Sequence, residues 1–287
     1  MPICQKKHYG VIGHPIGHTM SPFIHEQLFR LTGEDADYSV FDIPPEELPE
    51  KEKEILSHLD GYNVTIPNKR AILPLLDEID GKAKLYGSVN TVKNGTVKTG
   101  SSTDPVGFVT ALKSDGIPLS GRVLILGAGG VSRIMACEAG LAGCDLTIAT
   151  REKSVSDARK LAEDVENLTG KPVQTCLLAE IPEKMEHIDL MVNGTSVGMY
   201  PHADAMPVSE ETVAKCSAIF DAVYNPEETM LLRCGKQHGV KVLGGMSMLV
   251  WQAAEAQHIW SGAQFREEDI HKIIRAASAE MAKKFGA

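Results

Sequence analysis

Three segments in the first third of the chain carry polar side chains that a plain scaffold does not need. A Gly/Pro-rich loop presents hydroxyls at Thr19 and Ser21, a strand-like segment carries Asn63 and Thr65, and Asn90 follows further along. Neutral hydrogen-bonding groups of this kind suit a substrate with several hydroxyls and one carboxylate. Each residue alone has a commoner role as a helix cap or turn former, so only their joint presence indicates a binding site.

Lys69 and Asp104 are the charged pair that accompanies this set. A lysine beside a carboxylate in a closed cleft is suited to proton transfer during the oxidation of an alcohol. Lys69 taken alone would be an ordinary surface charge. The sequence leaves the role of Lys69 open between a proton-transfer base and a group that stabilises alkoxide charge.

The segment from Arg122 to Arg151 predicts a second kind of chemistry. A buried apolar run leads directly into Gly127-Ala-Gly-Gly-Val-Ser-Arg133, and a helix and a second strand follow. Gly127 permits the tight turn, Gly129 lets backbone approach a pyrophosphate, and the start of the helix presents free N–H groups to phosphates. The sixth position of this motif is Ser132 rather than Gly or Ala. The order of elements still predicts a dinucleotide-binding βαβ unit, and with it a nicotinamide-dependent oxidoreductase.

The end of the second strand of this unit bears on the choice of nicotinamide. An acidic residue there would hold the 2′-hydroxyl of NAD. This chain instead has Thr150 and Arg151, with Lys153 or Ser154 close by, and these groups can hold a phosphate through charge-assisted hydrogen bonds. NADP is therefore favoured, although Glu152 is an unfavourable neighbour and NAD stays an alternative.

The elements that must position these groups alternate between strand and helix, which is typical of an α/β fold with parallel sheets covered by helices on both faces. We expect an α/β substrate-binding catalytic domain formed by residues 1–104 plus 248–287, and a Rossmann-type doubly wound dinucleotide-binding domain at 105–247. Expected strands are 9–12, 38–42, 61–66, 89–93, 96–100, 123–126, 145–149, 173–177, 190–193, 218–221 and 240–243. Expected helices are 22–31 (with Ser21 as its N-cap), 45–56, 105–115, 130–142, 156–169, 247–260 and 267–285. The Asn94-Gly95 pair predicts a hairpin turn.

Composition excludes several classes of protein. The 287 residues are 43% hydrophobic and 23% charged, which is ordinary for a globular chain of two domains. A formal net charge of −9 without a basic run argues against non-specific binding to nucleic acid or to an anionic membrane. No run reaches the roughly 18 apolar residues of a membrane-spanning helix, and the N-terminus lacks a signal-peptide core.

The cysteines and histidines give no sign of a metal site. The six cysteines are scattered without metal-binding spacing, so we expect reduced thiols in a cytoplasmic protein. His14, His18 and His25 crowd the N-terminal loop without acidic or cysteine partners. We therefore expect no metal and a small-molecule substrate, in a monomer or a homodimer.

The polar segments also resemble those of the shikimate dehydrogenase family. From about residue 8 to 262 the chain carries, in the family's order, GHPIGHTMSP, NVTIPNK, VNT, TDPVGF, GAGG, NGTSVGM, DAVYNPEETMLL and GMSMLVWQ. The ordered set is highly specific and is similar to that of a shikimate or quinate/shikimate dehydrogenase. The resemblance implies reversible NADP-linked reduction of 3-dehydroshikimate to shikimate, in the biosynthesis of chorismate and aromatic amino acids.

The resemblance also implies roles for the matching residues. Lys69 and Asp104 would be the catalytic pair, and Thr19 and Ser21 would hold the substrate carboxylate. The rest of the pocket would be formed by Asn63, Thr65, Asn90, Tyr224 and Gln252. The cofactor would be bound by Gly127, Ala128, Gly129, Gly130, Thr150 and Arg151, with Thr195, Val223, Gly245 and Met248 along it towards the nicotinamide.

Three departures from the family pattern keep alternatives open. Thr19 stands where most shikimate-specific members have Ser, Ser102 replaces an Asn before Thr-Asp, and Glu152 follows Thr150-Arg151 where Asn-Arg-Thr is typical. A quinate or dual-specificity dehydrogenase using NAD or NADP is the nearest alternative. A methylene-tetrahydrofolate dehydrogenase type and a non-catalytic paralogue that senses shikimate-pathway ligands are others, against which the ordered motifs and the retained Lys69 and Asp104 argue.

Overall fold

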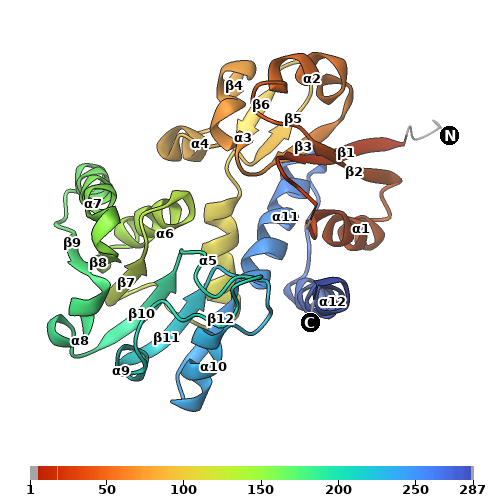
Figure 1. The fold of residues 1–287 in the computed structure, drawn as a ribbon. Coiled ribbons are helices and arrows are strands. Elements are labelled where there is room, and N and C mark those ends of the chain that lie inside the picture. The colour runs from red at the N-terminus through yellow and green to blue at the C-terminus, as the bar shows by residue number, and fades with distance from the viewer. Residues whose placement is uncertain (1–5, 18, 286–287) are drawn as a thin grey trace. The chain divides into compact units, whose positions relative to one another are not determined.

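The chain folds into two compact α/β units. The structure, a computed structural model, describes residues 6–17 and 19–285, so Cys4 and His18 lie outside the described residues. One unit comprises Met1–Gly107 and Val250–Ala277, and the other comprises Phe108–Leu249 and Ser278–Ala287. Figure 1 shows a sheet in each unit. The functional domain boundaries expected near 104 and 248 stay a prediction.

The sheet of the first unit is mixed rather than parallel throughout. Its strand order is β2-β1-β3-β5-β6-β4. Strand β1 pairs in parallel with β2 and β3, whereas β5 is antiparallel to both β3 and β6, and β4 is parallel to β6. The expectation of a parallel sheet therefore holds for only part of this unit. The strands are β1 (Lys7–Gly13), β2 (Ala36–Asp42), β3 (Gly61–Val64), β4 (Glu78–Ile79), β5 (Thr91–Lys93) and β6 (Thr99–Ser101).

The hairpin between β5 and β6 has a longer connection than a two-residue turn. The side chain of Asn94 donates to the carbonyls of Leu56 and Leu59, at 2.7 and 2.8 Å, and so fixes this connection to a neighbouring segment. The backbone N–H of Lys98 donates to Asp77 instead of to the opposite strand. Strand β6 consequently begins at Thr99, three residues later than expected.

Helices of the first unit surround its sheet and supply an aromatic cluster. Trp260 of α11 stacks on Tyr9 of β1 at 4.6 Å between ring centroids and donates its indole N–H to the carbonyl of Val92. A Cβ at Gly61 would lie 2.5 Å from this indole, so only glycine permits the close approach. The helical elements lying wholly or partly in this unit are α1 (Ser21–Thr32), α2 (Leu48–Glu54), η1 (Leu56–His58), α3 (Asn68–Ala71), η2 (Leu73–Leu75), α4 (Gly81–Tyr86), α5 (Asp104–Ser114), α11 (Gly245–Ser261) and α12 (Glu267–Phe285).

The start of α1 differs from the prediction that Ser21 is its N-cap. Met20 occupies the N-cap position and no side chain caps the helix, so Ser21 is already helical. The backbone N–H of Ser21 donates to the hydroxyl of Thr19 at 3.2 Å. The two hydroxyl-bearing residues are thus joined at the beginning of the helix.

The second unit has the strand order of a Rossmann fold. All six strands are parallel, in the order β12-β11-β10-β7-β8-β9. Numbered within this unit and read from the β9 edge, the order is 3-2-1-4-5-6, which is the doubly wound order of a Rossmann fold. The apolar runs of β7, β10 and β11 are almost wholly buried, as a parallel sheet covered on both faces requires. The strands are β7 (Arg122–Leu126), β8 (Asp145–Thr150), β9 (Gln174–Leu177), β10 (Ile188–Asn193), β11 (Cys216–Asp221) and β12 (Lys241–Gly244).

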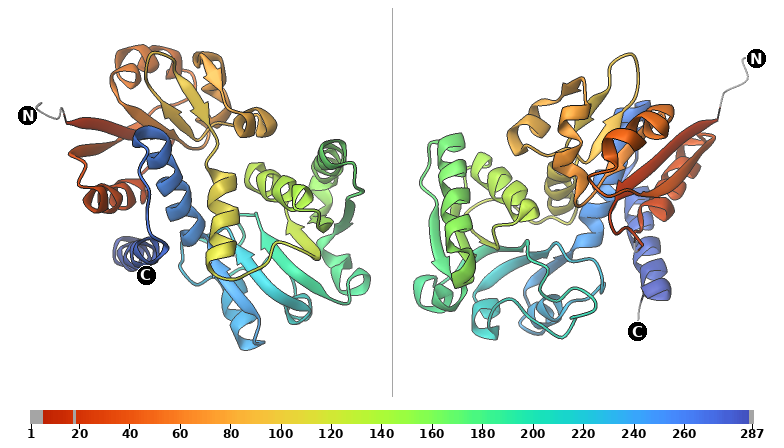
Figure 2. Two further views of the ribbon diagram at one scale, coloured as in Figure 1. Left: turned by 180° about the vertical axis from the view of Figure 1, so that it is seen from behind. Right: turned by 45° about the horizontal axis from the view of Figure 1, so that its top comes forward.

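Helices cover both faces of this parallel sheet. Figures 1 and 2 show α6 (Gly130–Leu141) and α7 (Val155–Thr169) on one face and α9 (Glu210–Ala214) and α10 (Met230–Gln237) on the other. The remaining helical elements are η3 (Glu152–Ser154), η4 (Leu178–Glu180) and α8 (Ile181–Lys184). No helix among the described residues is long and apolar enough to cross a membrane.

Candidate functional site

The first unit brings Lys69 and Asp104 into direct contact. Lys69 lies in α3, just after β3, and its Nζ donates to Asp104 Oδ2 at 2.5 Å. The two side chains are 23% and 13% exposed, so the pair is largely buried while one edge stays accessible. Asp104 is the first residue of α5, where the helix dipole favours a negative charge. The fold therefore forms the charged pair that the sequence singled out.

Asn90 holds the other oxygen of Asp104. Its Nδ2 donates to Asp104 Oδ1 at 2.9 Å, and its Oδ1 accepts from the backbone N–H of Thr103 at 2.7 Å. Gln252 of α11 adds its Oε1 to this cluster, 3.3 Å from Asn90 Nδ2 and 3.2 Å from the hydroxyl of Thr103. Both oxygens of Asp104 are thus engaged, which fixes the rotation of its carboxylate.

Asn63 lies next to this cluster and has its own set of partners. Its Nδ2 donates to the carbonyl of Asn90 at 3.2 Å and to the hydroxyl of Thr91 at 3.1 Å. Its Oδ1 accepts from the phenol of Tyr38 at 2.6 Å. Sequence reasoning missed Tyr38, because nothing in the strand pattern of β2 distinguishes its hydroxyl from any other polar group.

Thr19, Ser21 and Thr65 follow the carboxyl ends of two neighbouring parallel strands. Thr19 and Ser21 come after β1, and Thr65 directly follows β3, with its N–H donating to the carbonyl of Ile12. Carboxyl ends of parallel strands meet at one edge of a sheet, where ligands of α/β proteins bind. Hydrogen bonding to Ser21 opposes the strong rise that burial causes in the pKa of Tyr38.

Ser102 has no partner for its hydroxyl within the described part of the chain. Its Oγ is buried beside Thr103 and Asp104 without a hydrogen bond. Ser102 therefore contributes a buried polar atom without a partner to the loop that precedes Asp104.

In the second unit, the glycine loop after β7 explains both Gly127 and the unexpected Ser132. Gly127 has φ +94°, and a Cβ there would lie 2.8 Å from Thr195 Cγ2. The hydroxyl of buried Ser132 lies 3.3 Å from the carbonyl of Leu126 and 3.2 Å from that of Gly194. A Cβ at Gly194 would lie 2.3 Å from this hydroxyl, so glycine at 194 accommodates the serine.

The beginning of α6 is open in the way a phosphate-binding site requires. Gly129 is the N-cap of this 12-residue helix, and no side chain caps it. A Cβ built on Gly129 or Gly130 would meet nothing within 4 Å. Backbone N–H groups at such an end attract phosphate through their partial positive charge. Half-buried Ala128 precedes them in the same loop.

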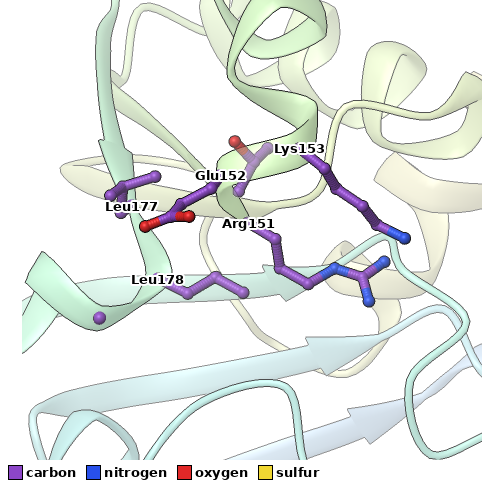
Figure 3. A pocket seen from close by; sticks show the side chains of 7 residues that line it. Arg151, Glu152, Lys153, Leu177 and Leu178 are labelled. Atoms are coloured by element: carbon purple, nitrogen blue, oxygen red, sulfur yellow. The ribbon is translucent and has the colours of Figure 1, made fainter.

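A pocket of about 450 Å³ lies at the carboxyl ends of β8 and β9. Figure 3 shows the side chains of Arg151 and Lys153 directed to the same side, whereas Glu152 is directed towards Leu177. The buried Thr150 Oγ1 has no hydrogen-bond partner among the described residues. Two cations and an unpaired hydroxyl suit a phosphate on the adenosine ribose. The pocket is lined by Thr150, Arg151, Glu152, Lys153, Leu177, Leu178 and Ala179.

A buried carboxylate organises the segments expected near the nicotinamide. Asp221, at the end of β11, accepts from Asn193 Nδ2, the N–H of Val223 and the hydroxyl of Thr229, at 2.9, 3.1 and 2.6 Å. Asn193 Oδ1 in turn accepts from the hydroxyl of Thr195 at 2.7 Å. Burial raises the pKa of Asp221, and these hydrogen bonds oppose the rise. Sequence reasoning missed this network, whose members are dispersed along the chain.

The remaining candidates also lie in the second unit. Gly245 begins α11, and a Cβ there would lie 2.2 Å from the carbonyl oxygen of Ala222, which explains the glycine. Met248 is buried in the first turns of the same helix, and Tyr224 is half-buried just after β11. The binding roles expected for all of these residues stay predictions.

Known proteins are similar to this chain in sequence and in fold. The family model described as shikimate dehydrogenase substrate binding domain matches residues 11–92. A shikimate dehydrogenase (NADP(+)) of Caldanaerobacter subterraneus subsp. tengcongensis is 37% identical over 273 residues, covering 94% of this chain and 96% of that protein.

Two solved structures extend the similarity to the fold. Shikimate 5-dehydrogenase from Thermus thermophilus, in complex with NADP(H) and shikimate, is 34% identical with a TM-score of 0.84, and the match covers 94% of this chain and 99% of that one. The shikimate 5-dehydrogenase of Listeria monocytogenes, in complex with shikimate and NAD, is 30% identical with a TM-score of 0.85, over 94% and 96% of the two chains.

Proposed function

The chain belongs to the shikimate dehydrogenase family, and from this membership we propose that it catalyses the reversible NADP-linked reduction of 3-dehydroshikimate to shikimate. This oxidoreductase reaction serves the biosynthesis of chorismate and aromatic amino acids. The observation that carries the proposal is the contact between Lys69 Nζ and Asp104 Oδ2 at 2.5 Å, in a cluster of neutral hydrogen-bonding side chains.

The first unit has groups for each part of such a substrate. Thr19 and Ser21, at the uncapped start of α1, would bind the carboxylate, because hydroxyls and a helix N-terminus both favour an anion. The first turn of α1 contains no acidic residue that would oppose this charge. The ring hydroxyls would be bound by Asn63, Thr65, Asn90 and Gln252, and the family resemblance adds Tyr224 to this set.

Lys69 would act on the oxygen that changes oxidation state. In the direction of reduction, its ammonium donates a hydrogen bond and then a proton to the carbonyl oxygen, and in the reverse direction the amine takes that proton back. Asp104 keeps the ammonium close and directed, and Asn90 fixes the carboxylate in turn. NADPH, when bound, supplies the hydride for the ring carbon.

The second unit has the groups that would hold this cofactor. The open backbone at Gly129 and Gly130 suits the pyrophosphate, and Arg151 with Thr150 suits the 2′-phosphate of NADP. Thr195, Val223, Gly245 and Met248 would line the way to the nicotinamide. Gly127 and Ala128 form the turn before the helix.

A four-way assay tests this function and separates it from its nearest alternatives. Steady-state rates are measured with shikimate and with quinate, each with NADP⁺ and with NAD⁺. We expect the highest kcat/KM with shikimate and NADP⁺. A higher kcat/KM with quinate would establish a quinate or dual-specificity enzyme instead, and absence of turnover with every pair would support a ligand-sensing protein. A cytoplasmic location and a monomeric or homodimeric state stay expectations.

A further inference from the structure

Three side chains of types that can bind a metal ion meet on the second unit, apart from the residues assigned to substrate and cofactor. Glu210 begins α9, Cys234 lies in α10, and His238 follows as the C-cap of α10. Their ligand atoms, a carboxylate oxygen, the Sγ and an imidazole nitrogen, all lie within 4.8 Å of one another. Cys234 and His238 are four residues apart, a spacing that places both on the same helix face.

Two of the three donor atoms are already in direct contact. His238 Nε2 and Glu210 Oε1 are 2.8 Å apart, and these side chains are 31% and 69% exposed. Cys234 is only 9% exposed, and its Sγ lies within 4.8 Å of the other two donor atoms. Two nearby cations of α10, Arg233 and Lys236, form ion pairs with Glu228, which lies outside the cluster.

The donor set identifies the class of ion. A thiolate, an imidazole and a carboxylate together are ligands of zinc, at about 2.0–2.3 Å from the metal. Tetrahedral donors at such distances are separated by roughly 3–4 Å. The Glu210 side chain is 69% exposed, so solvent leaves it room to move from its 2.8 Å contact with His238 to this separation. Hard cations such as Mg²⁺ and Ca²⁺ prefer oxygen ligands only.

We propose that Glu210, Cys234 and His238 bind one Zn²⁺ ion, with water as the fourth ligand. Binding displaces the thiol proton of Cys234 to solvent, and the thiolate forms the bond to zinc without any change of oxidation state. The sequence predicted no metal because its cysteines are scattered and its N-terminal histidines lack cysteine or acidic partners nearby in sequence, whereas the fold brings Glu210 to Cys234 and His238.

Such an ion would connect the first residue of α9 to the end of α10. α10 begins after Thr229, whose hydroxyl donates to Asp221 and accepts from the N–H of Leu232 in the helix. Zinc would therefore raise the thermal stability of the second unit, because a ligand that binds only the folded state stabilises it.

The experiment uses the purified full-length chain after removal of metals with a chelator. Co²⁺ is added as a spectroscopic probe, and Zn²⁺ is then titrated against a chromogenic chelator. We expect one equivalent of bound metal, a thiolate-to-cobalt charge-transfer band that Zn²⁺ abolishes, and a Zn²⁺-dependent rise in Tm. Zn²⁺ should also slow alkylation of Cys234, measured by peptide mass spectrometry.

Variants assign the signals to Cys234 and His238. C234S should lack the charge-transfer band, and H238Q should bind zinc more weakly, by more than the roughly 10–100-fold that loss of an outer-shell partner costs. C176S is the matched control, since Cys176 is also 9% exposed but lies outside the cluster, and it should behave like the unmodified chain.

Two results would overturn the proposal. One is Co²⁺ binding without a charge-transfer band in the unmodified chain. The other is equal zinc affinity for H238Q and the unmodified chain. Because His238 is partly exposed, we expect H238Q to fold, so this comparison remains informative even if C234S does not fold. Neither readout depends on dehydrogenase activity.

Discussion

The phenol of Tyr38 donates a 2.6 Å hydrogen bond to Asn63 Oδ1 and so fixes the orientation of the Asn63 side-chain amide. Since the Nδ2 of the same amide donates to Asn90 and Thr91, the carbonyl and amino groups of Asn63 each have a fixed partner. Asn90 also holds Asp104. A chain of hydrogen bonds therefore runs from Tyr38 through Asn63 and Asn90 to the proposed catalytic pair.

Replacing Tyr38 by Phe should weaken substrate binding more than turnover. The variant leaves Asn63 Oδ1 without its buried donor, at a cost of about 1–3 kcal/mol, and frees the amide to turn. We expect the KM for shikimate to rise about tenfold, with kcat changed much less, in steady-state kinetics. Tyr62→Phe is the matched control, because the buried hydroxyl of Tyr62 has no hydrogen-bond partner among the described residues. Equal KM values for the two variants would contradict a positioning role for Tyr38.

Replacing Lys69 by Ala should abolish most of the turnover and leave NADP binding nearly unchanged. General acid–base catalysis contributes about 10²–10⁴-fold, and the variant also leaves Asp104 without its counter-ion. Stopped assays of kcat and fluorescence titration with NADPH measure the two effects separately. Lys93→Ala serves as a control, since Lys93 is an exposed lysine that donates to the carbonyl of Ile259. Near-normal turnover of the Lys69 variant would refute its catalytic assignment.

Replacing Arg151 by Ala should reduce the preference for NADP over NAD. Loss of a charge-assisted hydrogen bond of about 1.5–3 kcal/mol predicts a fall of about 10–100-fold in kcat/KM for NADP⁺, with little change for NAD⁺. Glu152→Gln should act in the opposite direction, because it removes a negative charge that borders the same pocket. The ratio of kcat/KM for the two cofactors is the measurement. An unchanged ratio in the Arg151 variant would place the 2′-phosphate elsewhere.

His25 should make the stability of the chain depend on pH. Burial lowers its pKa from 6.5 to about 3, and the ring stacks on Tyr38 at 4.3 Å. The unfolded chain therefore takes up a proton below pH 6.5 that the folded chain does not, so this residue destabilises the fold as the pH falls from 6.5 towards 3. The loss is about 2 kcal/mol at pH 5.

Urea unfolding at pH 7 and pH 5 checks this expectation. The free energy of unfolding should fall more for the unmodified chain than for His25→Phe, which keeps a ring against Tyr38 but cannot titrate. Comparing the pH dependence, rather than the absolute stability, removes the packing cost of the substitution. The same slope in both proteins would show that His25 is not the group responsible.

The sequence predicted the second unit more completely than the first, for reasons visible in particular elements. Its buried strands, such as β7 and β10, contain short apolar runs, and α6 and α7 are long enough to show helical periodicity. Several helices of eight residues or fewer, namely α3, α4, α8, α9 and α10, were not predicted, since so few turns give little periodic signal. The antiparallel pairing of β5 with β3 depends on contacts between distant segments.

The candidate site likewise has residues that the sequence predicted and residues that it did not. Lys69, Asp104 and the glycine loop follow from motifs in which neighbouring residues act together. Tyr38 and Asp221 act through side chains that are 25 and 28 residues away in sequence, on Asn63 and Asn193 respectively. Local patterns do not carry such pairings, and a polar residue inside a strand has the same appearance whether or not its partner is part of a site.

The contact of Ser132 with Gly194 has a consequence for the history of this sequence. These residues are 62 positions apart, yet the serine hydroxyl occupies the space that a side chain at position 194 would need. A Cβ at position 194 would also lie only 2.9 Å from the backbone Cα of Ser132, so glycine at 194 should persist among descendants of this chain. Directed-evolution libraries that randomise position 194 should yield functional clones with glycine there, even where position 132 becomes smaller.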